Sequence, residues 1–386
     1  MSGFIDLDHA ATTPLDPAVR AAMLEWLDDT GYGNPASDHA LGRRARAAVE
    51  AARAEVAALI GASSEEIIWT SGATEANNLA IKGALEFRGA ERAHLITSRI
   101  EHKSVVDTCR YLETRGVRVS WLDPDPGGRI DTARVIAALR PETVLVSLMW
   151  VNNETGTINP VAELAPLLRE RGVLLHVDAV QAAGKLAIDL AALPIDLLSL
   201  SAHKFYGPKG IGALFVRKRP RARLAPQLHG GGHEQGMRSG TLATHQIVGM
   251  GVAARLAAAR RAGDAERLAA LCARLERQLT SLPGVLRNGD AAHAAPHILN
   301  LSFAGIDGES LRARLPMLAV SSGSACSSAT REPSYVLRAL GRDDRLAGAS
   351  LRFSPGRATR ETDIDAAAQQ VRAAVGLLRE LAPGDA

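Results

Sequence analysis

Between about Asp16 and Met250, short apolar runs alternate with amphipathic segments, and this pattern constrains the fold more than any other feature. The apolar runs are "EEIIWT", "AHLITS", "TVLVSLMWV", "VLLHVDAV" and "DLLSLSAH", and the helical patterns include "ATEANNLAIKGALE", "SVVDTCRYLETRG" and "PVAELAPLLRERG". Runs made almost entirely of Val, Ile and Leu predict strands that are buried on both faces, as in a parallel sheet between helices. The sequence therefore predicts an α/β fold with a mostly parallel sheet.

The chain beyond Met250 has a different pattern. An Ala- and Arg-rich amphipathic segment, residues 251–284, leads out of the first region and ends at Pro-Gly. Strand-like runs "HILNLSFAG" and "SLRFSPGR" then alternate with helical patterns, the last of which is "TDIDAAAQQVRAAVGLLREL". A chain of 386 residues has room for two domains. We predict a large domain of residues 15–257 and a smaller α+β domain of residues 1–14 and 258–386.

Composition narrows the class of partner and the compartment. The 45 basic and 42 acidic residues nearly balance, so net charge gives no reason to expect nucleic acid or membrane binding. The three cysteines form no C-x-x-C pair, which fits a reducing compartment. The N-terminus has no apolar targeting segment, and no apolar run reaches the roughly 20 residues of a membrane span. We expect a cytoplasmic protein whose partner is a small molecule or another protein.

Two ionisable residues follow buried strands. Asp178 ends the run "VLLHVD", and Lys204 follows "DLLSLSAH", so both should reach the crevice at the carboxyl ends of the strands. A lysine amine held against apolar residues is more nucleophilic, as Schiff-base formation requires. A buried acid needs a cationic partner, which a pyridinium nitrogen can provide. The alternative is a surface lysine and a salt-bridged aspartate with structural roles.

The string "WTSGATEANNLA" reads as a strand, a glycine turn and a helix start. Such a turn points several backbone N–H groups at one place and predicts an anion site, although an ordinary strand-to-helix connection has the same pattern. It matches neither G-x-x-x-x-G-K-[ST] nor G-x-G-x-x-G, which disfavours an ordinary nucleotide site. A lysine, an acid and a phosphate cradle together indicate pyridoxal phosphate.

Further polar residues follow other predicted strands. His102 lies just past "HLITS" and could stack on a cofactor ring or transfer protons, or could simply cap a helix. Gln181 lies three residues after Asp178 and could donate to a cofactor oxygen, or be an exposed helix-start residue. Asn153 follows "LVSLMWV" and should face the same crevice.

Nine strings occur in order along most of the chain: "LDHAATTPLDP", "GNPAS", "SGATEANNLAIKG", "EHKSV", "VNNETG", "HVDAVQ", "SAHKFYGPKGIG", "GGGHEQGMRSGT" and "SSGSACSSA". In this order and spacing the chain resembles cysteine desulfurases of the NifS/IscS type, in class V of the pyridoxal-phosphate aminotransferase superfamily. The resemblance extends from the first ten residues to near residue 360.

The resemblance implies a fold type I homodimer with a seven-stranded type of sheet in its large domain. It implies pyridoxal 5′-phosphate–dependent removal of sulfur from L-cysteine, giving L-alanine and a persulfide that passes to an acceptor protein in iron–sulfur cluster or thiolation pathways. By motif it implies these roles: Lys204 as the Schiff-base lysine, Asp178 at the pyridine nitrogen, His102 on the ring, Gln181 at the phenolate oxygen, Ala73, Thr74, Ser201 and His203 at the phosphate, Thr241 reaching in from the other subunit, and Asn153 and Arg352 at the substrate carboxylate.

Cys326 lies among small residues in "AVSSGSACSSAT", where nothing can pack against it as it would against a core cysteine. The resemblance implies that its thiolate attacks the substrate sulfur and carries the persulfide. We expect residues from about 320 to 333 to form a mobile loop. At ~3.3–3.6 Å per extended residue, such a loop would let the thiol travel roughly 20 Å.

Other readings stay open from the sequence. Another class V enzyme, such as a small-amino-acid aminotransferase or a selenocysteine lyase, would share the lysine, acid and phosphate cradle, and a silent sulfur carrier would share the fold. His229 and His233 are separated by three glycines that oppose a helix, so no metal site is expected. The basic run "RKRPRAR", residues 217–223, is either a solvated loop or a docking patch for an acidic acceptor.

Overall fold

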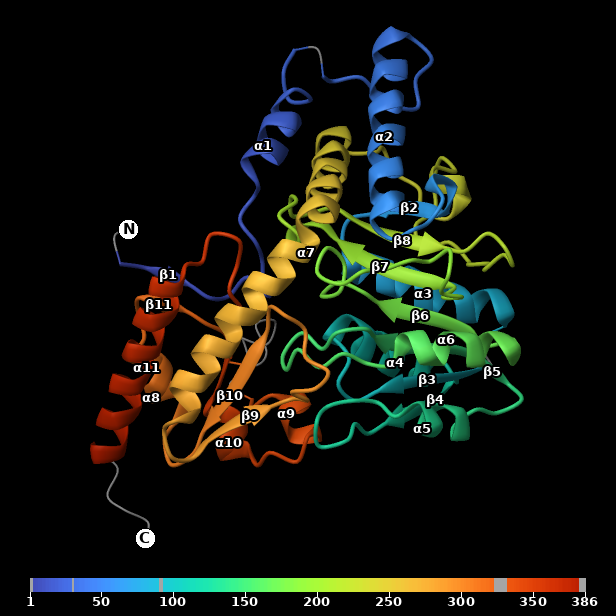
Figure 1. Ribbon diagram of the computed structural model, residues 1–386. Helices are drawn as coiled ribbons and strands as arrows, with labels where there is room; N and C mark the ends of the chain where they lie inside the picture. The colour runs from blue at the N-terminus through green and yellow to red at the C-terminus, as the bar shows by residue number, and fades with distance from the viewer. Residues whose placement is uncertain (1–2, 30, 90–92, 323–331, 382–386) are drawn as a thin grey trace.

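The computed structural model describes residues 3–29, 31–89, 93–322 and 332–381. Within them, a seven-stranded sheet has the order β2-β8-β7-β6-β5-β3-β4 (Figure 1). Its strands are β2 (Ile67–Thr70), β3 (His94–Ser98), β4 (Arg118–Leu122), β5 (Thr143–Met149), β6 (Leu174–Asp178), β7 (Leu197–Ser201) and β8 (Gly212–Val216).

The predicted mostly parallel sheet is confirmed, with β8 as the reversed strand. β8 is antiparallel to β2 and β7, whereas β7, β6, β5, β3 and β4 pair in parallel. A parallel connection needs a crossover of a dozen or more residues, usually with a helix. The segment from 202 to 211 contains only a one-turn helix, η3 (Ala202–Lys204), so the chain returns antiparallel.

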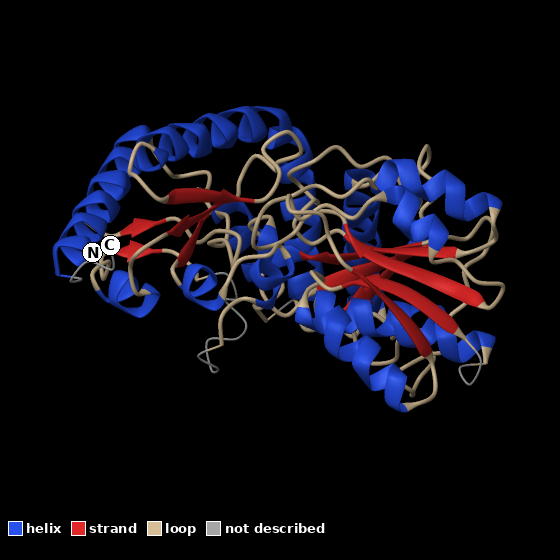
Figure 2. Cartoon of the chain, turned by 90° about the horizontal axis from the view of Figure 1, so that it is seen from below, coloured by secondary structure: helices blue, strands red, loops and turns tan. Residues whose placement is uncertain are grey.

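Helices cover both faces of this sheet (Figure 2). Successive strand residues point to opposite faces, so Ile68 packs with α3 (Ala73–Arg88) and α4 (Lys103–Thr114), whereas Ile67 and Trp69 pack with α2 (Ala40–Leu59), α6 (Val161–Glu170) and α7 (Thr244–Thr280). Two shorter helices, α1 (Pro17–Leu24) and α5 (Thr132–Ala137), complete this part. The strands are therefore buried on both sides, as their continuous apolar runs predict.

A smaller unit lies beside the first (Figure 1). It contains an antiparallel sheet, order β12-β10-β9, and a parallel pair formed by β1 and β11. Its elements are β1 (Ile5–Asp6), β9 (Val285–Asn288), β10 (Leu299–Phe303), β11 (Leu318–Ala319), β12 (Ser350–Phe353), α8 (Gly308–Ala313), α9 (Tyr335–Ala339), α10 (Asp344–Gly348) and α11 (Glu361–Leu381). Because β1 pairs with β11, the first residues of the chain join its C-terminal part.

The 37-residue helix α7 belongs to two cores. Ile247 and Met250, in its first half, are buried against the larger sheet, whereas Leu268 and Leu275 pack with β10, β12 and α11. The division into residues 15–257 and the remainder stays a proposal, and the two separate apolar cores support it.

Candidate active site

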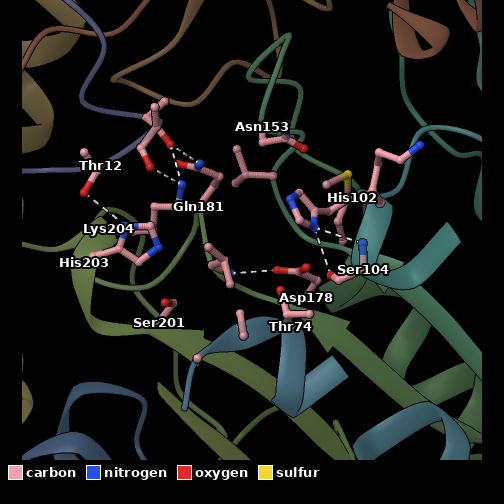
Figure 3. A pocket seen from close by; sticks show the side chains of 18 of the residues that line it. Thr12, Thr74, His102, Ser104, Asn153, Asp178, Gln181, Ser201, His203 and Lys204 are labelled. Carbon is pink, nitrogen blue, oxygen red and sulfur yellow. Dashed lines mark hydrogen bonds between the residues drawn. The ribbon is translucent and has the colours of Figure 1, made fainter. Parts of the chain in front are cut away.

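A cavity of about 550 Å³ lies at the carboxyl ends of β2, β3, β5, β6 and β7, where ligands of open α/β sheets bind (Figure 3). The strand ends, the N-terminal segment and β12 contribute its wall. Ten of the residues predicted for the site line it: Ala73, Thr74, His102, Asn153, Asp178, Gln181, Ser201, His203, Lys204 and Arg352.

Lys204 lies at the end of the one-turn helix η3 that follows β7. Its ammonium donates hydrogen bonds to the backbone oxygens of Ala10, at 2.8 Å, and Ala11, at 2.7 Å. Thr13 donates to the backbone oxygen of His203 from both its amide and its hydroxyl, which fixes the N-terminal segment against the lysine turn. The chain thus places the amine in the cavity wall and holds it with carbonyl oxygens.

Asp178 is the last residue of β6, and only 5% of its surface is exposed. Its Oδ2 accepts a hydrogen bond from Asn77 Nδ2 at 2.8 Å, and its Oδ1 accepts one from the amide of Val180 at 3.1 Å. Both donors are neutral amide groups. A buried carboxylate with neutral partners suits a cationic N–H in the cavity, because charge pairing offsets the cost of burying the acid.

The cavity wall also contains the start of α3. This helix begins after Gly72 without any side-chain cap, and its first N–H groups have no partner inside the helix. A Cβ atom built on Gly72 would meet no atom within 4 Å, so this backbone faces open space. Ser201 and His203 line the same cavity. The helix start, the hydroxyl and the imidazole form a donor set for an anion.

His203 is a neutral donor in this set. Burial, aided by the charges of Lys204 and Lys209, lowers the pKa of His203 to about 4. Its Nδ1 lies 3.2 Å from Thr12 Oγ1 (Figure 3). The ring therefore stays uncharged at neutral pH and can offer a hydrogen bond without adding positive charge.

The side-chain amide of Gln181 is oriented by a buried histidine. Its Nε2 donates to the backbone oxygen of Ala10 at 2.9 Å, and its Oε1 lies 3.2 Å from His297 Nε2. An amide oxygen can only accept, so the proton of the histidine is on Nε2. Burial and the charges of Lys185, Arg352 and Lys204 hold the pKa of His297 well below its usual range. A neutral His297 thus fixes the amide of Gln181 with its Nε2 toward the backbone oxygen of Ala10, and Gln181 and Ala10 both line the cavity.

Arg352 projects from β12, with 2% of its side chain exposed. Its Nη2 donates to Asp8 Oδ1 at 2.8 Å and to Ser321 Oγ at 3.1 Å, and its Nη1 donates to the backbone oxygen of Asn153 at 2.6 Å. Its Nε is buried with no hydrogen-bond partner among the described residues. Arg352 lines the cavity, and a guanidinium there can receive a carboxylate.

Glu154 is a second buried acid of the cavity wall, with 1% of its surface exposed. It accepts a hydrogen bond from the hydroxyl of Ser334, which caps α9 by accepting from the amide of Leu337. Burial raises the pKa of Glu154 to about 7, although Ser334, Arg352 and His102 act in the opposite direction. This acid links the cavity to the helix that follows the predicted cysteine loop.

Comparison with known proteins identifies the family. Residues 5–367 match the family described as Aminotransferase class-V. The chain belongs to the class V aminotransferase family. Among curated relatives, "Cysteine desulfurase IscS" of Azotobacter vinelandii is 57% identical over 381 residues, covering 98% of this chain and 94% of the relative. The protein of the same name from Pseudomonas aeruginosa strain LESB58 is 56% identical over the same shares.

Solved structures give the same answer for the fold. A "NIFS-LIKE PROTEIN" superposes with a TM-score of 0.90 at 34% identity, covering 97% of this chain and 100% of the other. "SspA in complex with cysteine" matches with a TM-score of 0.82 at 38% identity, covering 91% and 98%. The predicted resemblance to NifS/IscS-type enzymes and the predicted fold type I architecture are confirmed.

The cavity of this class V member fits pyridoxal phosphate. Asp178 offers a buried carboxylate for a ring N–H, the start of α3 offers backbone donors for a phosphate, and Lys204 offers an amine in the wall of the same cavity. These residues would hold the cofactor, which supplies a carbonyl carbon and an electron-withdrawing ring.

The two remaining predicted residues are Cys326 and Thr241. Cys326 and most of its predicted loop lie outside the described residues. Thr241 is exposed, and within the described chain it is absent from the cavity wall. Its assignment to the site of another subunit stays a prediction.

Other sequence features have plain structural outcomes. Arg217, the first residue of the basic run, donates to the backbone oxygens of Ile195, Leu190 and Leu193, so it is a structural arginine rather than part of a solvated patch. Among the residues that the structure describes, no group of three or more His, Cys, Asp and Glu side chains could hold a metal ion. In the same residues no helix is both long and apolar enough to cross a membrane.

Sequence reasoning missed four residues of the site: Asp8, Asn77, Ser104 and Glu154. Asn77 lies among the buried residues Ala76, Leu79 and Ala80 of α3. A polar residue on the apolar face of a predicted helix is the signal that could have found it. Asp8 had no such signal, because its partner, Arg352, lies near the other end of the chain.

Proposed function

We propose that this chain is a pyridoxal-phosphate–dependent cysteine desulfurase. The observation that carries the proposal is the convergence of Lys204, Asp178 and Arg352 on one cavity, in a chain 57% identical to relatives named cysteine desulfurase. The reaction converts L-cysteine and a protein thiol into L-alanine and a protein persulfide. One carbon–sulfur bond breaks, one sulfur–sulfur bond forms, and no outside oxidant is needed.

Each wall residue has a task in this reaction. Arg352 receives the substrate carboxylate at the cavity wall, with Asn153 beside it. The cofactor withdraws electrons from the substrate Cα when it is bound. Lys204 Nζ then removes the Cα proton and returns a proton to the product carbon.

Cys326 is the proposed sulfur acceptor. Its thiolate is the reactive form, and it would attack the sulfur of bound cysteine while the carbon–sulfur bond breaks. The described flanks of its segment meet the site: Ser321 exchanges backbone hydrogen bonds with Arg352, and Ser334 donates to Glu154. These contacts support delivery of the acceptor thiol to this cavity.

We further propose a homodimer that passes the persulfide to an acceptor protein. Leu24, Leu27 and Tyr32 are 54%, 59% and 74% exposed, and apolar residues gathered in this way are typical of a subunit interface. In the dimer Thr241 would reach the phosphate of the partner's site. A cytoplasmic location, inferred from cysteine usage, is part of the same proposal.

The decisive experiment gives the purified holoenzyme L-cysteine without reductant and measures its intact mass. The protein should gain sulfur on Cys326, and Cys326→Ser should release no sulfide in the presence of dithiothreitol while it keeps the cofactor absorbance. Cys272→Ser is the matched control and should release sulfide normally, because Cys272 is buried. Full sulfide release by Cys326→Ser would overturn the proposed mechanism.

A second measurement tests the lysine. Borohydride reduction of the holoenzyme should fix the cofactor to the peptide that contains Lys204. A cofactor fixed to a different lysine would refute this assignment. If alanine forms from cysteine but no sulfur is retained by the protein, the chain is a lyase of the selenocysteine-lyase type.

A further inference from the structure

A continuous chain of hydrogen bonds connects two residues of the proposed cofactor site. Asn77 Nδ2 donates to Asp178 Oδ2 at 2.8 Å and to Ser104 Oγ at 2.9 Å. Ser104 Oγ lies 2.8 Å from His102 Nδ1 (Figure 3). Asp178 ends β6, Asn77 lies on α3, and His102 caps α4, so three elements meet through the side chains of Asn77 and Ser104.

The chemistry of the groups fixes each proton in this chain. A carboxylate oxygen can only accept, so the amide nitrogen of Asn77 faces Asp178, and its second proton goes to Ser104 Oγ. The backbone amide of Ser104 donates to His102 Nδ1 at 3.2 Å, so this ring nitrogen is an acceptor. The hydroxyl proton of Ser104 therefore also points at Nδ1, and the ring proton of His102 is on Nε2.

We propose that Asn77 and Ser104 are positioning residues that hold His102 as its Nε2–H tautomer and tie its orientation to Asp178. The imidazole then presents a proton donor to the cavity in its neutral form, whereas a proton on Nδ1 would oppose the backbone N–H of Ser104 and require the Ser104 hydroxyl to turn and accept. This inference rests on the proposed function for its catalytic meaning. The tautomer itself follows from the described hydrogen bonds alone.

The burial of Asn77 supports a dedicated role. Its side chain is completely buried on the apolar face of α3, and its Oδ1 has no hydrogen-bond partner among the described residues. An apolar residue of similar size would avoid that cost, since a buried polar atom without a partner is destabilising. The observed asparagine therefore stabilises something other than helix packing, and its two donated hydrogen bonds identify Asp178 and Ser104.

Ser104→Ala is the sharpest perturbation. It removes the hydroxyl that faces Nδ1 but keeps the backbone amide donor and the helix. Ser104→Thr keeps the hydroxyl and serves as the conservative variant. Ser281→Ala, at an exposed position after α7, is a matched control that should leave every readout unchanged. Loss of one neutral hydrogen bond should lower kcat about three- to tenfold with little change in KM.

The readout that does not depend on activity is nitrogen-15 NMR of the histidine side chains in the full-length holoenzyme, with His102 assigned by His102→Gln. Wild type should show the His102 Nε2–H tautomer, with the Nδ1 signal of a hydrogen-bonded acceptor. Ser104→Ala should shift the Nδ1 chemical shift toward that of a nitrogen that accepts a weaker hydrogen bond, because only the backbone amide of residue 104 then donates to it. Ser104→Thr should restore the wild-type chemical shift. Asn77→Ala should move the signal in the wild-type background and have little effect in Ser104→Ala, because it acts through Ser104.

The outcomes separate this inference from the proposed function. A protonated Nδ1 in the wild type, or identical His102 signals in wild type and Ser104→Ala, would overturn the inference. Failure of the wild-type holoenzyme to make alanine from cysteine would overturn the proposed function and leave the NMR result as a valid test of the tautomer.

Discussion

Replacing Glu154 with glutamine should stabilise the protein at about pH 8 and have little effect near pH 5. The side chain is buried, and burial raises the pKa of Glu154 to about 7 from an ordinary value of 4.5. The native state therefore binds this proton more tightly than the unfolded chain. The resulting contribution to stability is fully present below about pH 4.5 and is lost as the pH rises through 7.

The size of the effect follows from that difference. At 1.36 kcal/mol for each pKa unit, keeping Glu154 ionised in the folded state above pH 7 costs about 3 kcal/mol of the free energy of unfolding. Glutamine has the same shape, stays neutral, and can still accept the hydrogen bond of Ser334. The variant should therefore recover most of this free energy at high pH. At low pH Glu154 is protonated in the folded protein, so the variant and the wild type both have a neutral side chain there and should differ little in stability.

Thermal melts of the holoenzyme, followed by circular dichroism, measure the difference in Tm between variant and wild type. The difference should be small near pH 5 and should grow to several degrees by about pH 8. Glu170→Gln is the matched control, because the Glu170 side chain is 72% exposed, and its Tm difference should not depend on pH in this way. A Glu154→Gln difference that is equal at both pH values would refute the reasoning.

Two further predictions concern the rest of the molecule. Burial raises the pKa of Cys272 to about 12 and raises the pKa of Cys109 further. Iodoacetamide at about pH 8 should therefore leave both thiols unmodified in the native protein and alkylate both after denaturation. Peptide mass spectrometry measures the alkylation of each cysteine. Glu234→Ala removes a bidentate partner, at 2.7 and 2.9 Å, from the buried guanidinium of Arg53, and should lower the free energy of unfolding by about 3–5 kcal/mol in denaturant titrations. A loss below about 1 kcal/mol would contradict it.

Much of the fold could be predicted because its strands are buried on both faces. Continuous apolar runs indicate β5, β6 and β7 directly, and their ends indicate where ligands bind. The edge strand β4 has no such run, since its residues Arg118–Leu122 are partly or largely exposed. A half-exposed strand of mixed composition cannot be told from a loop by its own sequence.

The site divides in the same way. Lys204, Asp178 and His102 follow strands closely, so local pattern and chain order place them together. Asp8 meets Arg352 across 344 positions, through the pairing of β1 with β11 and the backbone bridge between Asp8 and Ser354. No local pattern records a contact of that kind, because it depends on how the two ends of the chain pack.

That long-range contact also bears on how substrate binds. Asp8 already gives Arg352 a carboxylate partner, so an incoming carboxylate must share the guanidinium with Asp8. Ser321 hydrogen-bonds to both Asp8 and Arg352. It lies five residues before Cys326, near the end of the described range 93–322. A carboxylate bound at Arg352 therefore acts on the same three-residue cluster that anchors one flank of that segment, so substrate binding and the placement of that flank depend on one guanidinium.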